Sequence, residues 1–160
     1  MKFINRADFS AKINGRFAPE KDAWLCNYFV SVFKCFSHTL SCRVKFETLI
    51  KKTQRLVALF NSEYPIYAFP DGIAGWRDVP RNRRLSPVQI FNTDELADLL
   101  RTRIYFRDPE KRVDNYHITD RDMSWVVVFS HHNDWHLYAP RELLDIAIRN
   151  GITSKKQGDR

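Results

Sequence analysis

The chain has 160 residues, of which 44% are hydrophobic and 14% aromatic, and its formal net charge is +7. This length suits one hydrophobic core and is short for two, and the apolar content excludes an intrinsically disordered chain. The positive excess lies in residues 1–62, which hold 11 Lys or Arg against 4 Asp or Glu. A basic half of this kind suits nucleic acid, an anionic membrane or an acidic protein partner, and equally an ordinary solvated helix surface.

The N-terminal stretch gives two indications about compartment. Met1 to Pro19 lacks the basic, apolar and small-residue order of a secretion signal, so we expect a cytoplasmic chain. The three cysteines, Cys26, Cys35 and Cys42, are odd in number and lack CxxC spacing, which favours buried thiols over disulfides or a zinc site. The short apolar start, Lys2-Phe3-Ile4, suits either an edge strand or a loose arm.

A first helix is predicted from Glu20, because Pro19 precedes it and acidic residues occupy its first turn. Ala23 to Phe36 is apolar almost all the way round, so this helix must be buried. The run is shorter than the roughly 20 residues that a membrane span requires, and we expect no membrane partner. Ser37 to Cys42 follows as a polar break.

A second N-terminal helix is predicted over Val44 to Phe60, where apolar residues recur at helical spacing. Its outer face is basic, with Lys45, Lys51, Lys52 and Arg55. This face is the best nucleic-acid candidate in the chain, although no helix-turn-helix glycine, RNP motif, GxxG loop or zinc finger accompanies it.

The stretch from Tyr64 to Pro87 lacks a helical pattern and carries a short predicted strand at Ile66 to Phe69. It also contains the candidate partner-binding residues Trp76, Arg77, Arg83 and Arg84. Trp and Arg are the residue types most often found as interface anchors. The same arginines could instead bridge acidic groups of their own domain, and the sequence does not separate the two interpretations.

Further strands and a capped helix follow this loop. Val88 to Phe91 is a predicted strand, and Asn92 with Glu95 three residues later forms a capping-box pattern at the start of a helix that runs from Asp94 to Arg103. Ile104 to Phe106 and Val113 to Ile118 are also predicted strands.

A hairpin is predicted between Trp125 to Ser130 and Trp135 to Tyr138, which are β-branched and aromatic runs around a polar segment. A two-residue turn at Asn133-Asp134 would place His131 opposite His136 and Phe129 opposite Tyr138. A longer loop over His131 to Asp134 would place Phe129 opposite His136.

The histidines of this hairpin have two interpretations. They are polar residues at a hairpin tip, or His131 and His136 share a divalent ion such as zinc with His117 or Asp134. In the second case Asp120 or Asp134 would serve as a base or further ligand of a hydrolase or nuclease. The segment matches no standard zinc pattern, since it is not HExxH, and we favour the first interpretation, with no cofactor.

The last predicted helix begins at Pro140 and stops at Gly151, and its core side is formed by Leu143, Leu144, Ile146, Ala147 and Ile148. Ser154 to Arg160 is polar and is predicted to be a disordered tail. We therefore expect one α+β domain over residues 1–153, in which a mainly antiparallel sheet packs against the two N-terminal helices, with two further helices.

The C-terminal half resembles small uncharacterised bacterial domains of the toxin-immunity type. The likeness covers residues 90–150 and is carried by the order of four features: the capped helix Asn92 to Arg103, the segment Tyr116 to Asp120, Ser124-Trp125 with its hydrophobic strand, and His132 followed by Asp134-Trp135. The resemblance implies a cytoplasmic domain that binds a cognate partner and performs no chemistry. The basic charge departs from that pattern and would require a partner with an acidic face.

Three functions follow from these observations. The first is a non-enzymatic protein-binding module, such as an immunity protein or antitoxin that neutralises a toxin, with Trp135 joining the arginine loop as an anchor. The second is the metal-dependent hydrolase or nuclease built on the hairpin histidines. The third is nucleic-acid binding through the basic helix.

Overall fold

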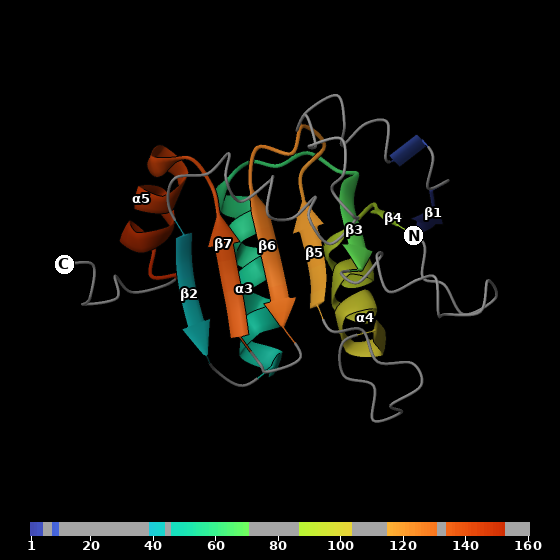
Figure 1. The fold of residues 1–160 in the computed structure, drawn as a ribbon, viewed down its shortest axis with the longest axis horizontal. Helices are drawn as coiled ribbons and strands as arrows, with labels where there is room; N and C mark the ends of the chain where they lie inside the picture. Colours follow the sequence, from blue (N-terminus) through green and yellow to red (C-terminus); the bar gives the residue numbers. More distant parts are fainter. Residues whose placement is uncertain are drawn as a thin grey trace, which may run out of the picture.

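The computed structural model describes residues 1–4, 8–9, 39–43, 46–70, 87–103, 115–130 and 134–152. These residues form an α+β fold with a seven-stranded antiparallel sheet and three helices (Figure 1). The strands are β1 (Lys2–Phe3), β2 (Thr39–Arg43), β3 (Ile66–Pro70), β4 (Val88–Ile90), β5 (Asn115–Thr119), β6 (Val126–Ser130) and β7 (Asp134–Tyr138). The helices are α3 (Phe46–Leu59), α4 (Thr93–Arg103) and α5 (Arg141–Arg149).

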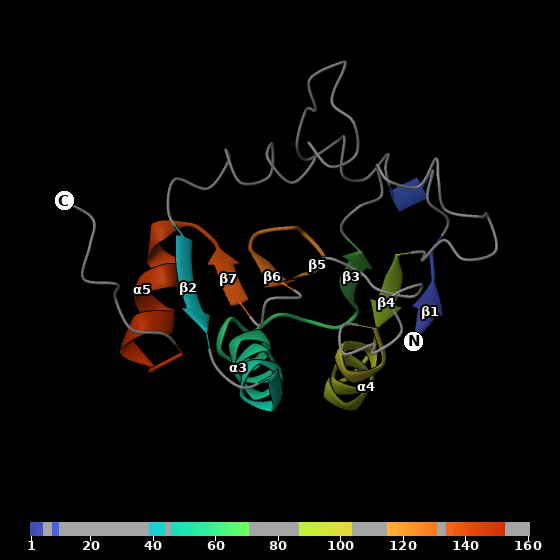
Figure 2. The same ribbon diagram turned by 60° about the horizontal axis from the view of Figure 1, so that its bottom comes forward.

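The strand order is β1-β4-β3-β5-β6-β7-β2, so β1 and β2 are the edges of the described sheet. β2 comes early in the chain but pairs with β7 over five residues, which joins two segments that are distant in sequence. Helices α3 and α4 cover the same face of the sheet, and α5 lies beside β2 (Figures 1 and 2). No helix of the described residues is long and apolar enough to cross a membrane.

The main core lies between the sheet and its helices. Its largest buried side chains are Trp125 on the approach to β6 and Trp135 on β7, both with 0% exposure. Each indole N–H has an acceptor, because Trp125 donates to Ser62 Oγ at 3.0 Å and Trp135 donates to Thr53 Oγ1 at 2.9 Å. A buried indole N–H without a partner would destabilise the fold, so these two bonds tie the sheet to α3 and to the turn that follows it.

The opposite face of the sheet is also apolar and buried. A second cluster lies on it, formed by Phe9, Tyr67, Phe69, Met123, Val126 and Val128. The Phe9 ring contacts the rings of Tyr67 and Phe69 at centroid distances of 5.7 Å and 5.1 Å. Both faces of the central strands therefore contribute to the core, which explains why β6 reads as a nearly continuous apolar run.

Local signals at the ends of two helices are confirmed. Asn92 Oδ1 accepts the Glu95 backbone N–H at 2.9 Å, and Glu95 Oε2 accepts the Phe91 N–H at 2.8 Å. These two reciprocal bonds cap the N-terminus of α4. At the end of α5, Gly151 has a φ of +66° and donates to Ile148 O, while Ile152 N–H bonds Ala147 O. This pair of bonds is a Schellman cap, which glycine favours because it has no Cβ.

Most predicted elements are confirmed. The second N-terminal helix is α3, and the predicted hairpin is β6–β7. Three of the four expected helices are among the described residues, and the first, from Glu20 to Phe36, lies outside them. The strand expected at Ile104 to Phe106 and the tail after Ser154 also lie outside.

Two local predictions were wrong. The polar break expected over Ser37 to Cys42 overlaps β2, because residues 39–43 gain a full ladder of partners on β7. Pro140 is the N-cap of α5 and not its first helical residue, since its ψ of 154° is extended. The open choice at the N-terminus is resolved, because Lys2–Phe3 forms the edge strand β1.

Candidate functional site

The register of the β6–β7 hairpin differs from both predicted pairings. Val128 lies opposite His136 and Phe129 lies opposite Trp135, so Phe129 faces neither Tyr138 nor His136. His131, which was expected opposite His136, lies outside the described residues. The observed register places the Trp135 indole in the main core, whereas the predicted ones would have turned it to the other face of the sheet.

His117 is a buried residue of β5, with 1% of its surface exposed. Its ring stacks on Phe69 with a centroid distance of 5.1 Å and an interplanar angle of 12°. Burial lowers the pKa of His117 to about 3, and a backbone hydrogen bond with Phe69 only partly opposes this effect. The imidazole is therefore neutral at physiological pH and packs as an aromatic residue of the second cluster.

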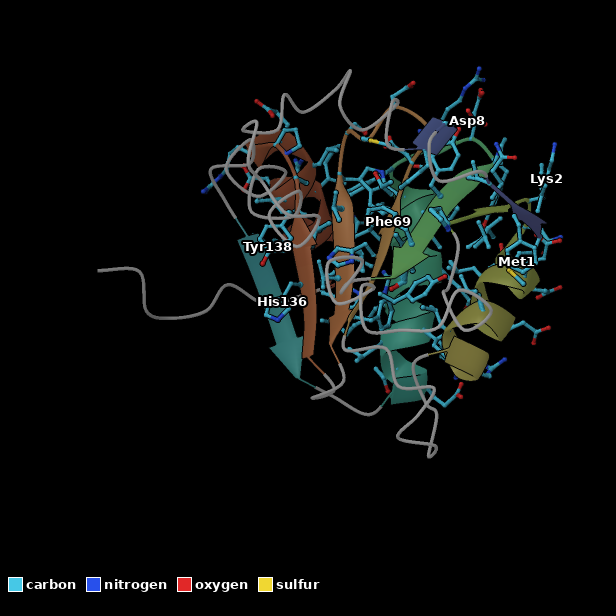
Figure 3. All side chains as sticks on the ribbon, turned by 45° about the vertical axis from the view of Figure 1, so that its right-hand side comes forward. Met1, Lys2, Asp8, Phe69, His136 and Tyr138 are labelled. Atoms are coloured by element: carbon cyan, nitrogen blue, oxygen red, sulfur yellow. The ribbon has the colours of Figure 1, made fainter. Side chains whose placement is uncertain are left out.

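His117 and His136 lie on the same face of the sheet, but Val128 separates them. Val128 is the Cα partner of His117 on one side and of His136 on the other, so the two histidines are two strand spacings apart, about 10 Å. The half-buried His136 ring lies 6.4 Å from the Tyr138 ring (Figure 3). Within the described residues, no three His, Cys, Asp or Glu side chains form a group that could hold a metal ion.

The two candidate aspartates of the metal hypothesis occupy different parts of the sheet. Asp120 organises the β5–β6 turn, where one carboxylate oxygen accepts the Ser124 N–H at 2.7 Å and the other accepts the Ser124 hydroxyl. Met123 closes this turn with a φ of +55°. Asp134 is the first residue of β7, and its Cα lies opposite that of Arg43 in the β2–β7 ladder. Asp120 thus has a structural role in ordering the turn.

The basic outer face of α3 is smaller than predicted. Lys51 and Arg55 are exposed, but Lys52 is half-buried and its Nζ donates to the Ile152 carbonyl, which ties α3 to the end of α5. Lys45 lies outside the described residues. Next to this face, Arg101 of α4 binds both carboxylate oxygens of Glu47, at 3.1 Å and 2.9 Å. Of the basic residues predicted to bind nucleic acid, the two that are described and exposed are therefore Lys51 and Arg55.

Of the five predicted partner-binding residues, one lies in the described part of the chain and four lie outside it. Trp76, Arg77, Arg83 and Arg84 lie outside the described residues. Trp135 has no exposed surface and its N–H is bonded to Thr53, so in this structure it packs the core and offers nothing to a partner. An aromatic residue in a strand is ambiguous in this respect, because its sequence does not show which face of the sheet is covered.

A group of exposed apolar side chains was not predicted. Met1, Phe3 and Phe91 are the large hydrophobic side chains of the described residues that remain exposed, at 46%, 62% and 45%. They lie at the β1–β4 end of the sheet, far from His136 and Tyr138, and Figure 3 shows Met1 beside α4. The only sequence signal was the short apolar start of the chain, whose exposure depends on the strand order.

Comparison of the chain with protein-family models, with curated proteins and with solved structures finds no match. A function must therefore be inferred from the chain's own surfaces. In the described residues these surfaces are an apolar sheet edge at β1 and a small basic strip on α3, next to a sheet that is buried on both faces.

Proposed function

We propose that the chain is a non-enzymatic protein-binding module that recognises a cognate protein, in the manner of an immunity protein or antitoxin that neutralises a toxin. The observation that carries this proposal is the exposure of Met1, Phe3 and Phe91, which lie at or next to the paired strands β1 and β4. Exposed apolar groups that cluster on an otherwise well-buried domain are typical of protein-interaction sites.

The roles of the candidate catalytic groups also support a binding function. Asp120 is used by a turn, and His117 is a neutral ring stacked inside the second cluster. His117 is only 1% exposed, and both carboxylate oxygens of the half-buried Asp120 accept bonds from Ser124. His117 and Asp120 stabilise the sheet and its turn. In the proposed function, binding is left to the exposed residues at the β1 edge.

The first test is recovery of a defined complex from the native host. A C-terminal affinity tag leaves β1 unaltered, and we expect purification to yield one protein partner at a fixed stoichiometry. Repetition with purified partner, by calorimetric titration, should then give a saturable binding curve. Recovery of the chain alone under several salt and detergent conditions would contradict the proposal.

The toxin-neutralising part of the proposal has its own test. Expression of the recovered partner alone should arrest growth, and co-expression of this chain should restore it. If the partner is harmless when expressed alone, the binding function stands but the immunity interpretation is wrong.

A further inference from the structure

His117 lies at the centre of the sheet face that carries the second cluster. It is the Cα partner of Phe69 on β3 and of Val128 on β6, and both partners belong to that cluster. Among the buried side chains of the described residues, it is the one whose ordinary pKa lies near neutral pH. Within this buried set, mild acid therefore acts on the face of the sheet that holds His117.

The cluster around His117 is closed by a segment outside the sheet. Of the described members of the cluster, Phe9 alone comes from neither a strand nor a turn of the sheet. Figure 2 shows the short blue segment of residues 8–9 on the side of the sheet away from α3 and α4. The Phe9 ring contacts the Phe69 ring, which in turn stacks on His117. The seat of Phe9 is therefore the same aromatic layer that contains the imidazole.

A proton on His117 is unfavourable while this face is closed. Burial is the largest effect on its pKa, and the opposing effect is a backbone hydrogen bond with Phe69. The cross-strand neighbours Phe69 and Val128 are apolar. The titratable groups of the surrounding elements are Tyr67 on β3, the half-buried His136 and Tyr138 on β7, and the exposed Asp8 beside Phe9. Of these groups Asp8 is the acidic one, and it lies in water.

Protonation of His117 favours every state in which its ring reaches water. Separation of Phe9 from the sheet is one such state and complete unfolding is another, and both gain equally from the proton. Separation keeps the ladders of β3, β5 and β6, and it keeps the hydrogen bond of Trp135 in the main core. It therefore requires less free energy than unfolding, and it remains the easier opening as the pH falls.

We propose that the second face is a pH-sensitive contact, at which protonation of His117 separates the Phe9 segment from the sheet while the main core stays folded. The opened ring has an ordinary pKa of about 6.5, whereas the pKa of the closed ring is lowered to about 3. The closed state thus has its full stability above the first value and loses it as the pH falls toward the second. From pH 7.5 to pH 5 the opened population should rise about 30-fold.

The methionines make this opening visible by NMR. Met123 is buried in the second cluster and Met1 is exposed, so a chain labelled only at its methionine methyl groups gives one signal from each. Relaxation dispersion of the Met123 methyl group measures the opened population. The Trp135 indole N–H, which bonds Thr53, reports the main core. We expect the rise of about 30-fold at Met123 together with an unchanged Trp135 signal.

Two variants assign the response to the imidazole. His117→Phe keeps an aromatic ring against Phe69 and removes the titrating group, so its opened population should stay constant over this pH range. Tyr138→Phe is the matched control, because it alters a half-buried residue that packs against the same cluster and removes no imidazole. It should keep the parental response. A cooperative urea transition at pH 7.5 shows that each variant is folded.

The parent chain supplies a second measurement that needs no substitution at His117. The imidazole Cε1–H signal of His117 should shift toward the protonated position in step with the Met123 methyl signal. An imidazole that stays neutral while Met123 opens would assign the acid response to another group. This outcome would overturn the inference even where His117→Phe does not fold.

Three further results would also overturn it. Loss of the Met123 and Trp135 signals at the same pH would show that acid unfolds the chain in one step. An equal rise in the parent and in His117→Phe would move the response to a different group, of which His136 is the nearest imidazole on this face. No opening at Met123 down to pH 4, where the population should have risen roughly 250-fold, would show that the face stays closed.

Discussion

Replacement of His117 tests how strongly the second face of the sheet depends on a neutral imidazole. The pKa of His117 is lowered to about 3 by burial, whereas an unfolded chain has a histidine pKa of about 6.5. Between these values the unfolded state binds the extra proton. The free energy of unfolding should therefore fall as the pH is lowered through this window.

The size of the effect follows from linkage. Going from pH 7.5 to pH 5, this one histidine should remove about 2 kcal/mol of stability, because the unfolded ring gains a proton and the folded ring does not. The loss at pH 5 depends only on the unfolded pKa, since His117 stays neutral in the fold at that pH. The full loss, reached below the folded pKa, would be about 5 kcal/mol.

Urea unfolding followed by tryptophan fluorescence at pH 7.5, 6 and 5 measures this loss. His117→Phe keeps an aromatic ring against Phe69 and removes the titrating group, so its stability should change about 2 kcal/mol less than that of the parent over the same range. Tyr138→Phe, a change on the same face of the sheet at a half-buried position that removes no imidazole, serves as the control and should retain the parental slope. Equal pH dependence of the parent and His117→Phe would refute the argument.

Three further substitutions test the contacts that shape the core and the helix ends, each by urea unfolding at neutral pH. Thr53→Val keeps the shape of the side chain but leaves the buried Trp135 N–H without its acceptor, and should destabilise the fold by about 1–3 kcal/mol. Ser62→Ala removes the acceptor of the Trp125 N–H and should destabilise less, because Ser62 is half-buried and water can replace its hydroxyl. Gly151→Ala should destabilise by about 1 kcal/mol from backbone strain alone, because φ is +66° and nothing lies within 4 Å of the added Cβ, while Gly151→Asn should be milder. Asn92→Ala removes the side-chain cap of α4 and should destabilise by about 1 kcal/mol, and an unchanged midpoint would show that water caps the helix equally well.

The parts of the fold that sequence reasoning predicted are those with local causes. Asn92 and Glu95 are three residues apart, and the cap they form involves only their own turn of helix. Gly151 ends α5 for the same kind of reason, because its bonds go back three residues and those of Ile152 five. Such contacts need no knowledge of the rest of the chain, so the sequence pattern is sufficient.

Elements that depend on distant partners were not predictable in this way. β2 is a five-residue segment that becomes a strand because β7, more distant in the sequence than any other strand, supplies its ladder. The exposure of Phe3 has a similar origin, since it follows from the position of β1 at the end of the strand order. Neither property is encoded in neighbouring residues, and both the missed strand and the unpredicted exposure of Phe3 share this cause.

The hairpin register could have been derived by weighing burial above turn geometry. The observed register buries Trp135 and Leu137 in the main core and leaves His136 and Tyr138 half-buried on the other face. A slip by one residue would exchange the two pairs, and it would cost about 2–3 kcal/mol for each large apolar side chain moved out of the core. Turn types differ by less than this, because Asn and Asp tolerate several turn conformations. Burial of Trp135 and Leu137 therefore sets the register of the hairpin.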